Sequence, residues 1–176
     1  RFLSPGPFEA RSLAEYLDRT RENFVIVDPD ERRRLILAAA KEAAASLSGK
    51  AYYDEALLDT LVFIVEYPCV ISGGFDAAYL FLPREVLATS MMTQQKYFPV
   101  IDEKGRLLPH FITVSNTLPR DPGIVRRGNE KVIRARLADA KFFFEEDRKV
   151  PLEARVEDLR GVVFHTLLGT SYEKVM

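Results

Sequence analysis

The residues best suited to chemistry in this 176-residue sequence are cations gathered in one short stretch. Six of them fall within sixteen positions: Arg126, Arg127, Lys131, Arg134, Arg136 and Lys141. Clustered Lys and Arg side chains are what proteins use to follow a phosphate backbone. One interpretation is therefore a nucleic-acid contact formed by Arg127, Lys131, Arg134 and Lys141, joined by Lys96 if the fold brings it near.

The plainer interpretation of the same stretch is a salt-bridged surface helix, and composition alone favours it. Glu130 can pair with Arg134 one turn further on, and Asp139 can pair with Arg136. Each such pair is worth only a few tenths of a kcal/mol. The cations alone do not decide between a contact surface and an ordinary solvated helix.

Two of the arginines cannot serve one surface. Residues advance by about 100° each around a helix, so Arg134 and Arg136 lie roughly 200° apart. Arg134 shares its side with the lysines and is expected to contact phosphate. We expect Arg136 to project between Val132 and Ala140, inside the apolar stripe, and to form a partly buried ion pair, with Asp139 as one candidate partner.

Other kinds of chemistry find little support. The only histidines are His110 and His165, and the only cysteine is Cys69, which is too few ligands at motif spacing for a metal site. Cys69 lies in an apolar run, where a cysteine usually packs as a small hydrophobic residue. Gly73-Gly74 fits a plain turn better than a phosphate-binding loop. The sequence predicts no catalytic residue and no metal site.

The bulk composition is that of a globular domain. Hydrophobic residues make up 47% of the chain and charged residues 29%, with a formal net charge of −1. Any nucleic-acid contact must then use a local basic surface, since there is no overall field to attract a polyanion. There is no apolar run of membrane-spanning length and no signal peptide. A single cysteine is typical of a reducing cytosol.

The pattern of apolar residues predicts an α+β fold, with several helices packed on a small mixed or antiparallel sheet. Tyr97–Ile101 and Leu107–Ser115 flank a Gly105 turn and predict a hairpin at about 97–115. Asp28 is expected to cap a helix that carries Arg33 to Leu47. Asp54 is expected to cap a second helix, which carries Leu57 to Val65 and is stopped by Pro68. Gly49 is expected to end the first of these in the left-handed conformation.

Further elements are predicted with less regular signals. Helices are expected over about 9–20, 84–95 and 152–159, and strands at Phe24–Val27 and Cys69–Ile71. A helical region starts at Asp121-Pro122 and runs to Asp147, either unbroken or broken at Gly128-Asn129 because glycine disfavours a helix interior. We expect one domain over residues 1–160, followed by a linker or the start of another domain over 161–176.

Several stretches together resemble one protein family. They are Arg1–Pro5, Val65–Pro68, Gly74–Asp76, Leu82–Leu87, Gln95–Val100, Gly105–Pro109, Gly128–Phe143 and Leu168–Thr170. In this order and at this spacing they resemble the β subunit of the bacterial glycyl-tRNA synthetase built from two α and two β subunits. One departure is that Met92 and Gln94 stand where the family usually has Lys and often His.

The resemblance implies an internal segment of the β subunit of a cytoplasmic glycine–tRNA ligase. It implies the tRNA for glycine, the α subunit and the rest of the β subunit as partners, with no membrane. ATP and Mg²⁺ are expected at the α subunit, which activates glycine, and no cofactor is expected in this segment. The segment is expected to support the subunit and to contribute to tRNA binding without a catalytic centre of its own.

Two alternatives remain open at the level of sequence. One is an editing-like hydrolase acting on mischarged tRNA, for which His110 is the only plausible general base. The other is a purely architectural module, in which Arg134 and Arg136 would be buried in ion pairs.

Overall fold

A computed structural model describes residues 6–176 of the chain. The family-like stretch Arg1–Pro5 lies outside the described residues. Contacts divide the chain into two compact units, Arg1–Leu137 and Ala138–Met176, called the first and the second unit below. The expected domain over residues 1–160 stays a prediction.

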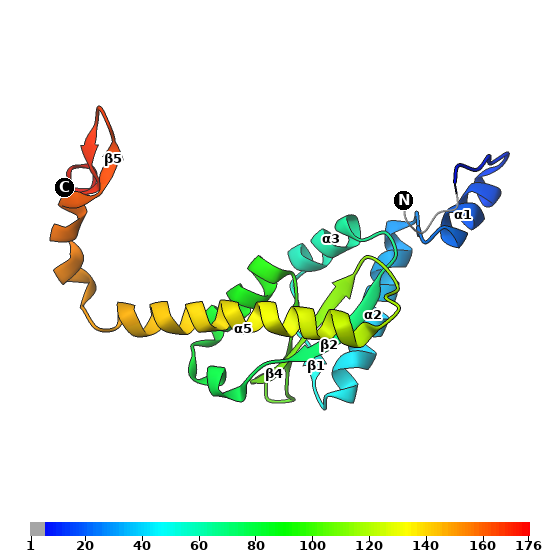
Figure 1. The fold of residues 1–176 in the computed structure, drawn as a ribbon, viewed down its shortest axis with the longest axis horizontal. Coiled ribbons are helices and arrows are strands. Elements are labelled where there is room, and N and C mark those ends of the chain that lie inside the picture. Colours follow the sequence, from blue (N-terminus) through cyan, green and yellow to red (C-terminus); the bar gives the residue numbers. More distant parts are fainter. Residues whose placement is uncertain (1–5) are drawn as a thin grey trace. The chain divides into compact units, whose positions relative to one another are not determined.

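The first unit is built on a four-stranded antiparallel sheet with the strand order β1-β3-β4-β2. The strands are β1 (Lys50–Ala51), β2 (Cys69–Gly74), β3 (Phe98–Ile101) and β4 (Leu107–Ser115). The predicted hairpin is confirmed as β3 and β4, and the predicted α+β class is confirmed with it (Figure 1).

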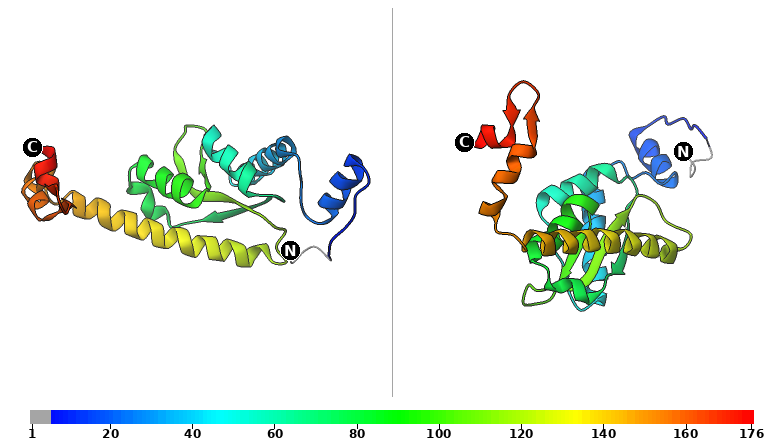
Figure 2. Two further views of the ribbon diagram at one scale, coloured as in Figure 1. Left: turned by 90° about the horizontal axis from the view of Figure 1, so that it is seen from above. Right: turned by 60° about the vertical axis from the view of Figure 1, so that its left-hand side comes forward.

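The central strand β4 is covered on both faces, which explains why its side chains are apolar on both. Ile112 faces the helices α2 (Pro29–Ser46) and α3 (Glu55–Ile64), whereas Phe111 faces α5 (Pro122–Asp147). Both side chains are fully buried. Figure 2 shows the sheet of the first unit between α2 and α3 on one side and α5 on the other.

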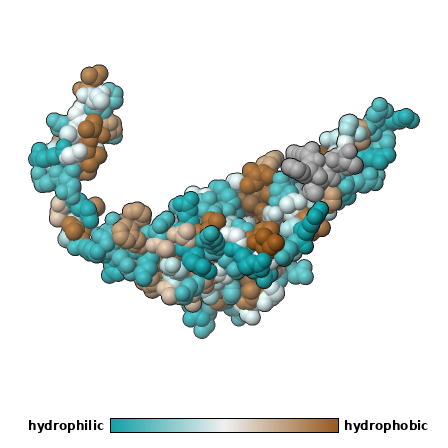
Figure 3. Space-filling view, viewed as in Figure 1, coloured by the Kyte–Doolittle hydropathy of each residue, from teal (hydrophilic) through white to brown (hydrophobic). Residues whose placement is uncertain are grey.

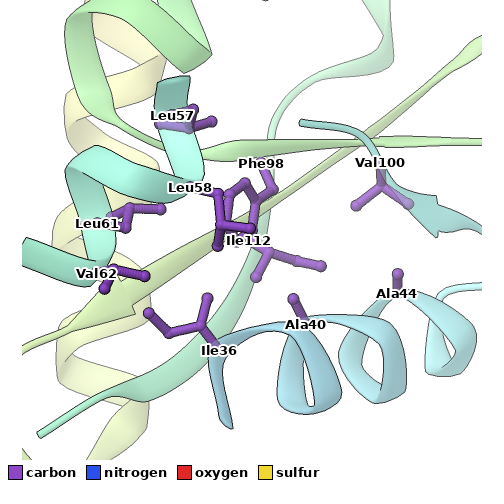
Figure 4. Packing of buried hydrophobic residues seen from close by; sticks show 10 residues of the cluster. All are labelled: Ile36, Ala40, Ala44, Leu57, Leu58, Leu61, Val62, Phe98, Val100 and Ile112. Atoms are coloured by element: carbon purple, nitrogen blue, oxygen red, sulfur yellow. The ribbon is translucent and has the colours of Figure 1, made fainter. Parts of the chain in front are cut away.

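The main core lies between the sheet and the two helices α2 and α3 (Figure 4). Its buried residues are Ile36, Ala40, Ala44, Leu57, Leu58, Leu61, Val62, Phe98, Val100 and Ile112. The alanines of α2 have short side chains, so the helix can approach the sheet closely.

Both predicted N-caps are present. The Asp28 carboxylate accepts a hydrogen bond from the N–H of Asp30 (2.9 Å), and that of Asp54 accepts one from the N–H of Leu57 (2.7 Å). The predicted role of Gly49 is wrong, because Ser48 takes the left-handed conformation (φ 57°). Gly49 is needed for close approach instead, since a Cβ atom there would lie 2.5 Å from Val100 Cγ1.

Two further local predictions are wrong for tertiary reasons. Residues 24–27 form no strand. Their backbone groups bind separate partners, such as the Glu66 carbonyl oxygen and the Arg32 side chain, and not a neighbouring strand. The Arg32 guanidinium donates to the carbonyl oxygens of Ile26 (2.6 Å), Val27 (3.0 Å) and Val62 (2.8 Å). Gly73 lies inside β2 and not in a turn, paired with Phe111 of β4. A Cβ atom there would lie 2.5 Å from Phe111 Cζ, so the position needs glycine for close packing.

The remaining elements of the first unit connect these layers. The chain forms α1 (Leu13–Glu22) before α2, close to the helix expected over 9–20. After β2 come a 3₁₀ helix, η1 (Ala77–Phe81), then α4 (Arg84–Ala88) and a π-helix, η2 (Thr89–Gln94). The last two together confirm the helix predicted over 84–95.

The helix α5 is continuous from Pro122 to Asp147, so the break considered at Gly128-Asn129 does not occur. The side chain of Asn129 is used in a tertiary contact described below. Of the predicted apolar stripe, Ile133 and Leu137 are fully buried, but Val132 is 43% exposed.

The second unit contains the end of α5 and several short elements. These are the 3₁₀ helices η3 (Leu152–Arg155) and η4 (Glu157–Gly161), the strands β5 (Val163–His165) and β6 (Gly169–Thr170), and α6 (Ser171–Val175). The single helix predicted over 152–159 is therefore two 3₁₀ turns. Among residues 6–176, no helix is both long enough and apolar enough to span a membrane.

Gly128 offers a test of the continuous helix. It is exposed, has helical neighbours on both sides, and a Cβ atom there would meet nothing within 4 Å. Gly128→Ala should therefore raise the free energy of unfolding by about 1 kcal/mol, the difference in helix propensity. Urea denaturation measures the change. Gly73→Ala is the matched control and should cost about 1–3 kcal/mol, since Phe111 leaves no room. A loss of stability in Gly128→Ala would contradict an unbroken α5.

The turn between β3 and β4 offers a second test, through Asp102. Its carboxylate accepts hydrogen bonds from the N–H groups of Arg106 (2.8 Å) and Lys104 (2.9 Å) and from Arg106 Nε (2.7 Å). These contacts, the Arg106 N–H foremost, lower the pKa of Asp102 below its ordinary value.

A carboxyl group whose pKa is depressed by folding stabilises the protein above its ordinary pKa, about 4, and this contribution is lost as the pH falls through the folded-state pKa. Asp102→Asn removes the titrating group. The variant should be less stable than the parent at neutral pH, and the difference should shrink as the solution is acidified. Melting temperatures measured from neutral pH down to about pH 2 follow the difference, and a constant difference would contradict this assignment.

Candidate nucleic-acid interface

A buried tyrosine fixes the roll of α5, that is, how far the helix is rotated about its own axis on the sheet. Tyr97 is 3% exposed, and its ring stacks on that of Phe111 with a centroid distance of 4.6 Å and an interplanar angle of 16°. Its hydroxyl donates a 2.6 Å hydrogen bond to Asn129 Oδ1, and Asn129 Nδ2 donates to the Val125 carbonyl oxygen (2.8 Å). Burial raises the pKa of Tyr97, so the hydroxyl keeps the proton that this bond requires.

A second polar contact lies one residue further along α5. Gly74 at the end of β2 donates its N–H to Glu130 Oε1 over 3.1 Å. An end-of-strand N–H without a ladder partner would otherwise be left unsatisfied in a part-buried position. Asn129 thus binds Tyr97, the residue just before β3, and Glu130 binds Gly74 at the end of β2, and together these contacts set which side of the helix turns inward.

With that side inward, three cations turn outward together. Arg127, Lys131 and Arg134 are all exposed. At about 100° per residue they fall within an arc of roughly 60°, and they span about 10 Å along the helix axis. We call these three residues the basic face.

No carboxylate neutralises the basic face among the described residues. The expected Glu130–Arg134 pair is absent, because the Glu130 carboxylate is used by the Gly74 N–H. No salt bridge within the described chain involves Arg127, Lys131 or Arg134. The plainer interpretation of α5, a salt-bridged helix, loses its principal pair.

The prediction for Arg136 is wrong. The side chain is exposed and forms no ion pair with Asp139 in the described structure. The buried side of α5 is centred on Ile133 and Leu137, and Arg136 lies at its margin, where a long side chain reaches water. The architectural alternative predicted that Arg134 and Arg136 would be buried in ion pairs, and neither is.

Two other predicted contact residues do not join the basic face. Lys141 lies in the second unit and forms an i,i+4 salt bridge with Glu145 (3.8 Å). Lys96 has a left-handed backbone (φ 59°) and lines a hollow of about 220 Å³ beside Asp54 and Thr60 of the α3 region. Their contacts with nucleic acid stay predictions.

The residues considered for other chemistry are poorly placed for it. Burial raises the pKa of the Cys69 thiol, which disfavours the nucleophilic thiolate. His110 lies in β4 opposite Gly74. A hollow of about 470 Å³ in the first unit is lined by residues such as Leu37, Ala40, Lys41 and Tyr53. No group of three metal-ligating side chains occurs among residues 6–176.

Sequence reasoning missed the residues that orient α5. The sequence placed Asn129 at a possible helix break, Glu130 in a surface ion pair and Tyr97 at the start of the predicted hairpin. A signal was present, because Asn129 and Glu130 precede the buried Ile133 by four and three residues and so lie on the same side of the helix.

Comparison with known proteins identifies the family. The whole chain, residues 1–176, matches the family model described as glycyl-tRNA synthetase beta subunit. The chain belongs to this family. Its residues 65–109 and 128–143, which carry most of the resemblance noted above, include Tyr97, Asn129 and Glu130.

Individual relatives agree with the family model. The glycine–tRNA ligase beta subunit of Syntrophus aciditrophicus is 63% identical over 175 residues, which is 99% of this chain and 25% of the relative. Those of Syntrophotalea carbinolica and Geobacter sulfurreducens are 51% and 50% identical over 100% and 99% of the chain, in each case 26% of the relative. The chain thus spans about a quarter of the length of the relatives it matches.

The hydrogen bond that orients α5 can be tested in the synthetase-family chain. Tyr97→Phe should lower the free energy of unfolding by about 1–2 kcal/mol, because Asn129 Oδ1 is left part-buried without its donor. In Tyr97→Phe/Asn129→Ala the two losses should not add, since both substitutions remove the same bond. Urea denaturation of the parent, the two single variants Tyr97→Phe and Asn129→Ala, and the double variant gives the coupling free energy between the two side chains. Strict additivity would show that the bond contributes nothing of its own.

Proposed function

We propose that this chain is a tRNA-contacting part of a glycine–tRNA ligase β subunit, and that the basic face of α5 contacts the phosphate backbone of the tRNA for glycine. The observation that carries the proposal is that the three cations of the basic face are exposed and that no described carboxylate pairs with them. Arg127, Lys131 and Arg134 lie on one exposed arc and have no carboxylate partner in the described chain. Membership of the glycyl-tRNA synthetase β-subunit family suggests tRNA as the nucleic acid that is bound.

The energetics of such a contact favour unpaired cations. An arginine already held in a salt bridge must give up that partner before it can bind phosphate, whereas an unpaired one releases only water and counterions. Arg134 and Arg127 can also offer a guanidinium fork to phosphate oxygens, which adds geometric selectivity. Phosphate contacts position the RNA without reading its sequence, so the basic face would hold tRNA in register and leave identity to other parts of the enzyme.

The proposal includes a division of labour between subunits. ATP, Mg²⁺ and glycine would be bound by the α subunit in the cytoplasm, and this segment would have no catalytic centre. Its support in this chain is that burial raises the pKa of the Cys69 thiol, which disfavours the nucleophilic thiolate. The segment's contribution to aminoacylation would therefore be to KM for tRNA more than to kcat.

The contact can be tested with a matched pair of charge reversals in the complete α and β enzyme. Arg134→Glu should weaken tRNA binding about tenfold at low salt and reduce the slope of log affinity against log salt by about 1. Arg136→Glu introduces the same charge change on the same helix, at a residue that is also exposed and has no salt bridge among the described residues. It lies about 160° from Arg134 by the shorter way around the helix axis. This variant should leave affinity close to that of the parent. Titrations at about 50 and 200 mM salt measure both quantities.

Stability must be followed in parallel, because a contact residue and a structural residue can both reduce activity. Both variants should melt at the temperature of the parent, since neither side chain is buried. Equal weakening by Arg134→Glu and Arg136→Glu would point to a diffuse charge effect, and no weakening by Arg134→Glu would refute the contact.

A further inference from the structure

The second unit has no hydrophobic core. None of its residues, 138–176, is buried. Large apolar side chains are exposed along the whole unit: Phe142 57%, Phe143 62%, Leu152 81%, Val163 68%, Leu167 88%, Leu168 69% and Val175 69%. Hydrophobic residues are visible as brown atoms on this part of the chain in Figure 3. We call these seven residues the apolar surface.

The contacts that organise the unit are mainly polar and leave the apolar surface unused. Arg160 pairs with Glu157 (2.6 Å) and lies 3.5 Å from the centroid of the Tyr172 ring. The Thr170 hydroxyl accepts from the Glu173 N–H, while the Glu173 carboxylate accepts from the Thr170 N–H (2.7 Å). The N–H of Ser171 also donates to the carbonyl oxygen of Val162 (2.7 Å), which joins α6 to the start of the β5–β6 hairpin.

Such a unit needs a covering partner. A chain of this size without a core, a disulfide or a metal cannot offset the conformational entropy of folding. Exposed apolar residues in this number mark an interaction surface. The short hairpin places Leu167 and Leu168 between its two strands, so these leucines project from a turn that its own hydrogen bonds have already shaped.

A nucleic acid is a poor fit for this surface. Most cations of the second unit already have a partner: Lys149 pairs with Glu146, Arg160 with Glu157, and Lys174 lies 3.9 Å from the Phe164 ring centroid. Phosphate would have to displace these contacts and would leave the leucines in water. Apolar side chains of a protein can cover these leucines, which phosphate cannot.

We propose that the apolar surface packs against the remainder of the β subunit itself. The relatives are about four times as long as this chain, so most of the polypeptide available for packing in the same subunit lies outside residues 1–176. A partner on the same chain is present at high effective concentration, which suits a surface that would otherwise cause aggregation. The inference rests on family membership and is independent of tRNA binding by the basic face.

The test uses the full-length β subunit carrying Leu167→Cys. Its reaction with a maleimide is followed at the level of the labelled peptide, so that Cys69 and other cysteines are resolved separately. Without the α subunit, labelling should be at least about tenfold slower than in the same protein unfolded in urea, because the side chain is covered. The 176-residue chain with the same substitution should label at close to the unfolded rate.

Three outcomes would overturn the proposal. Rapid labelling in the full-length β subunit would mean that nothing in the subunit covers Leu167. Protection that develops only after the α subunit is added would assign the surface to that subunit. Protection already present in the 176-residue chain would assign it to contacts within these residues.

A paired substitution gives an independent measurement. Leu167→Asp should lower the melting temperature of the full-length β subunit, whereas Thr166→Asp, which adds the same charge at the neighbouring exposed polar residue, should change it much less. An equal or smaller effect of Leu167→Asp would count against the proposal.

Discussion

The structure depends on how Phe111 is packed. Its ring faces α5 from the middle strand of the sheet, stacks on Tyr97 and leaves no room for a side chain at Gly73. The Tyr97 hydroxyl, held in place by this stack, then binds Asn129. The packing of one side chain therefore fixes the roll of α5, and the roll decides that Arg127, Lys131 and Arg134 face solvent.

The sequence predicted elements wherever the determining interactions are local. Asp28 and Asp54 cap their own helices, and Gly105 has the positive φ (76°) that the β3–β4 turn requires. It failed where a distant group decides. Phe24–Val27 has the composition of a strand, but Arg32 binds two of its carbonyl oxygens. Gly73 has the composition of a turn, but its small size serves the packing of Phe111.

The same distinction explains the candidate site. The cations of α5 are visible in the sequence because residue type and spacing reveal them. Their freedom from carboxylates is not, because it depends on Glu130 reaching Gly74, a residue 56 positions away. When the helix is considered alone, Glu130 is expected to form a salt bridge with Arg134. The exposure of Arg136 was missed for a related reason, since periodicity defines an apolar stripe but not how far the covering sheet extends over it.

The two units present opposite kinds of unsatisfied surface. In the first, Arg127, Lys131 and Arg134 have no ionic partner among the described residues, while Ile133 and Leu137 of the same helix are buried. In the second, cations such as Lys149 and Arg160 are paired while leucines and phenylalanines are exposed. Added salt screens attraction to phosphate but does not weaken apolar burial. If the two surfaces have the partners proposed, high salt should release tRNA from the enzyme and leave the packing of the second unit intact. The same chain can thus stay anchored in its subunit while its basic face binds and releases a polyanion.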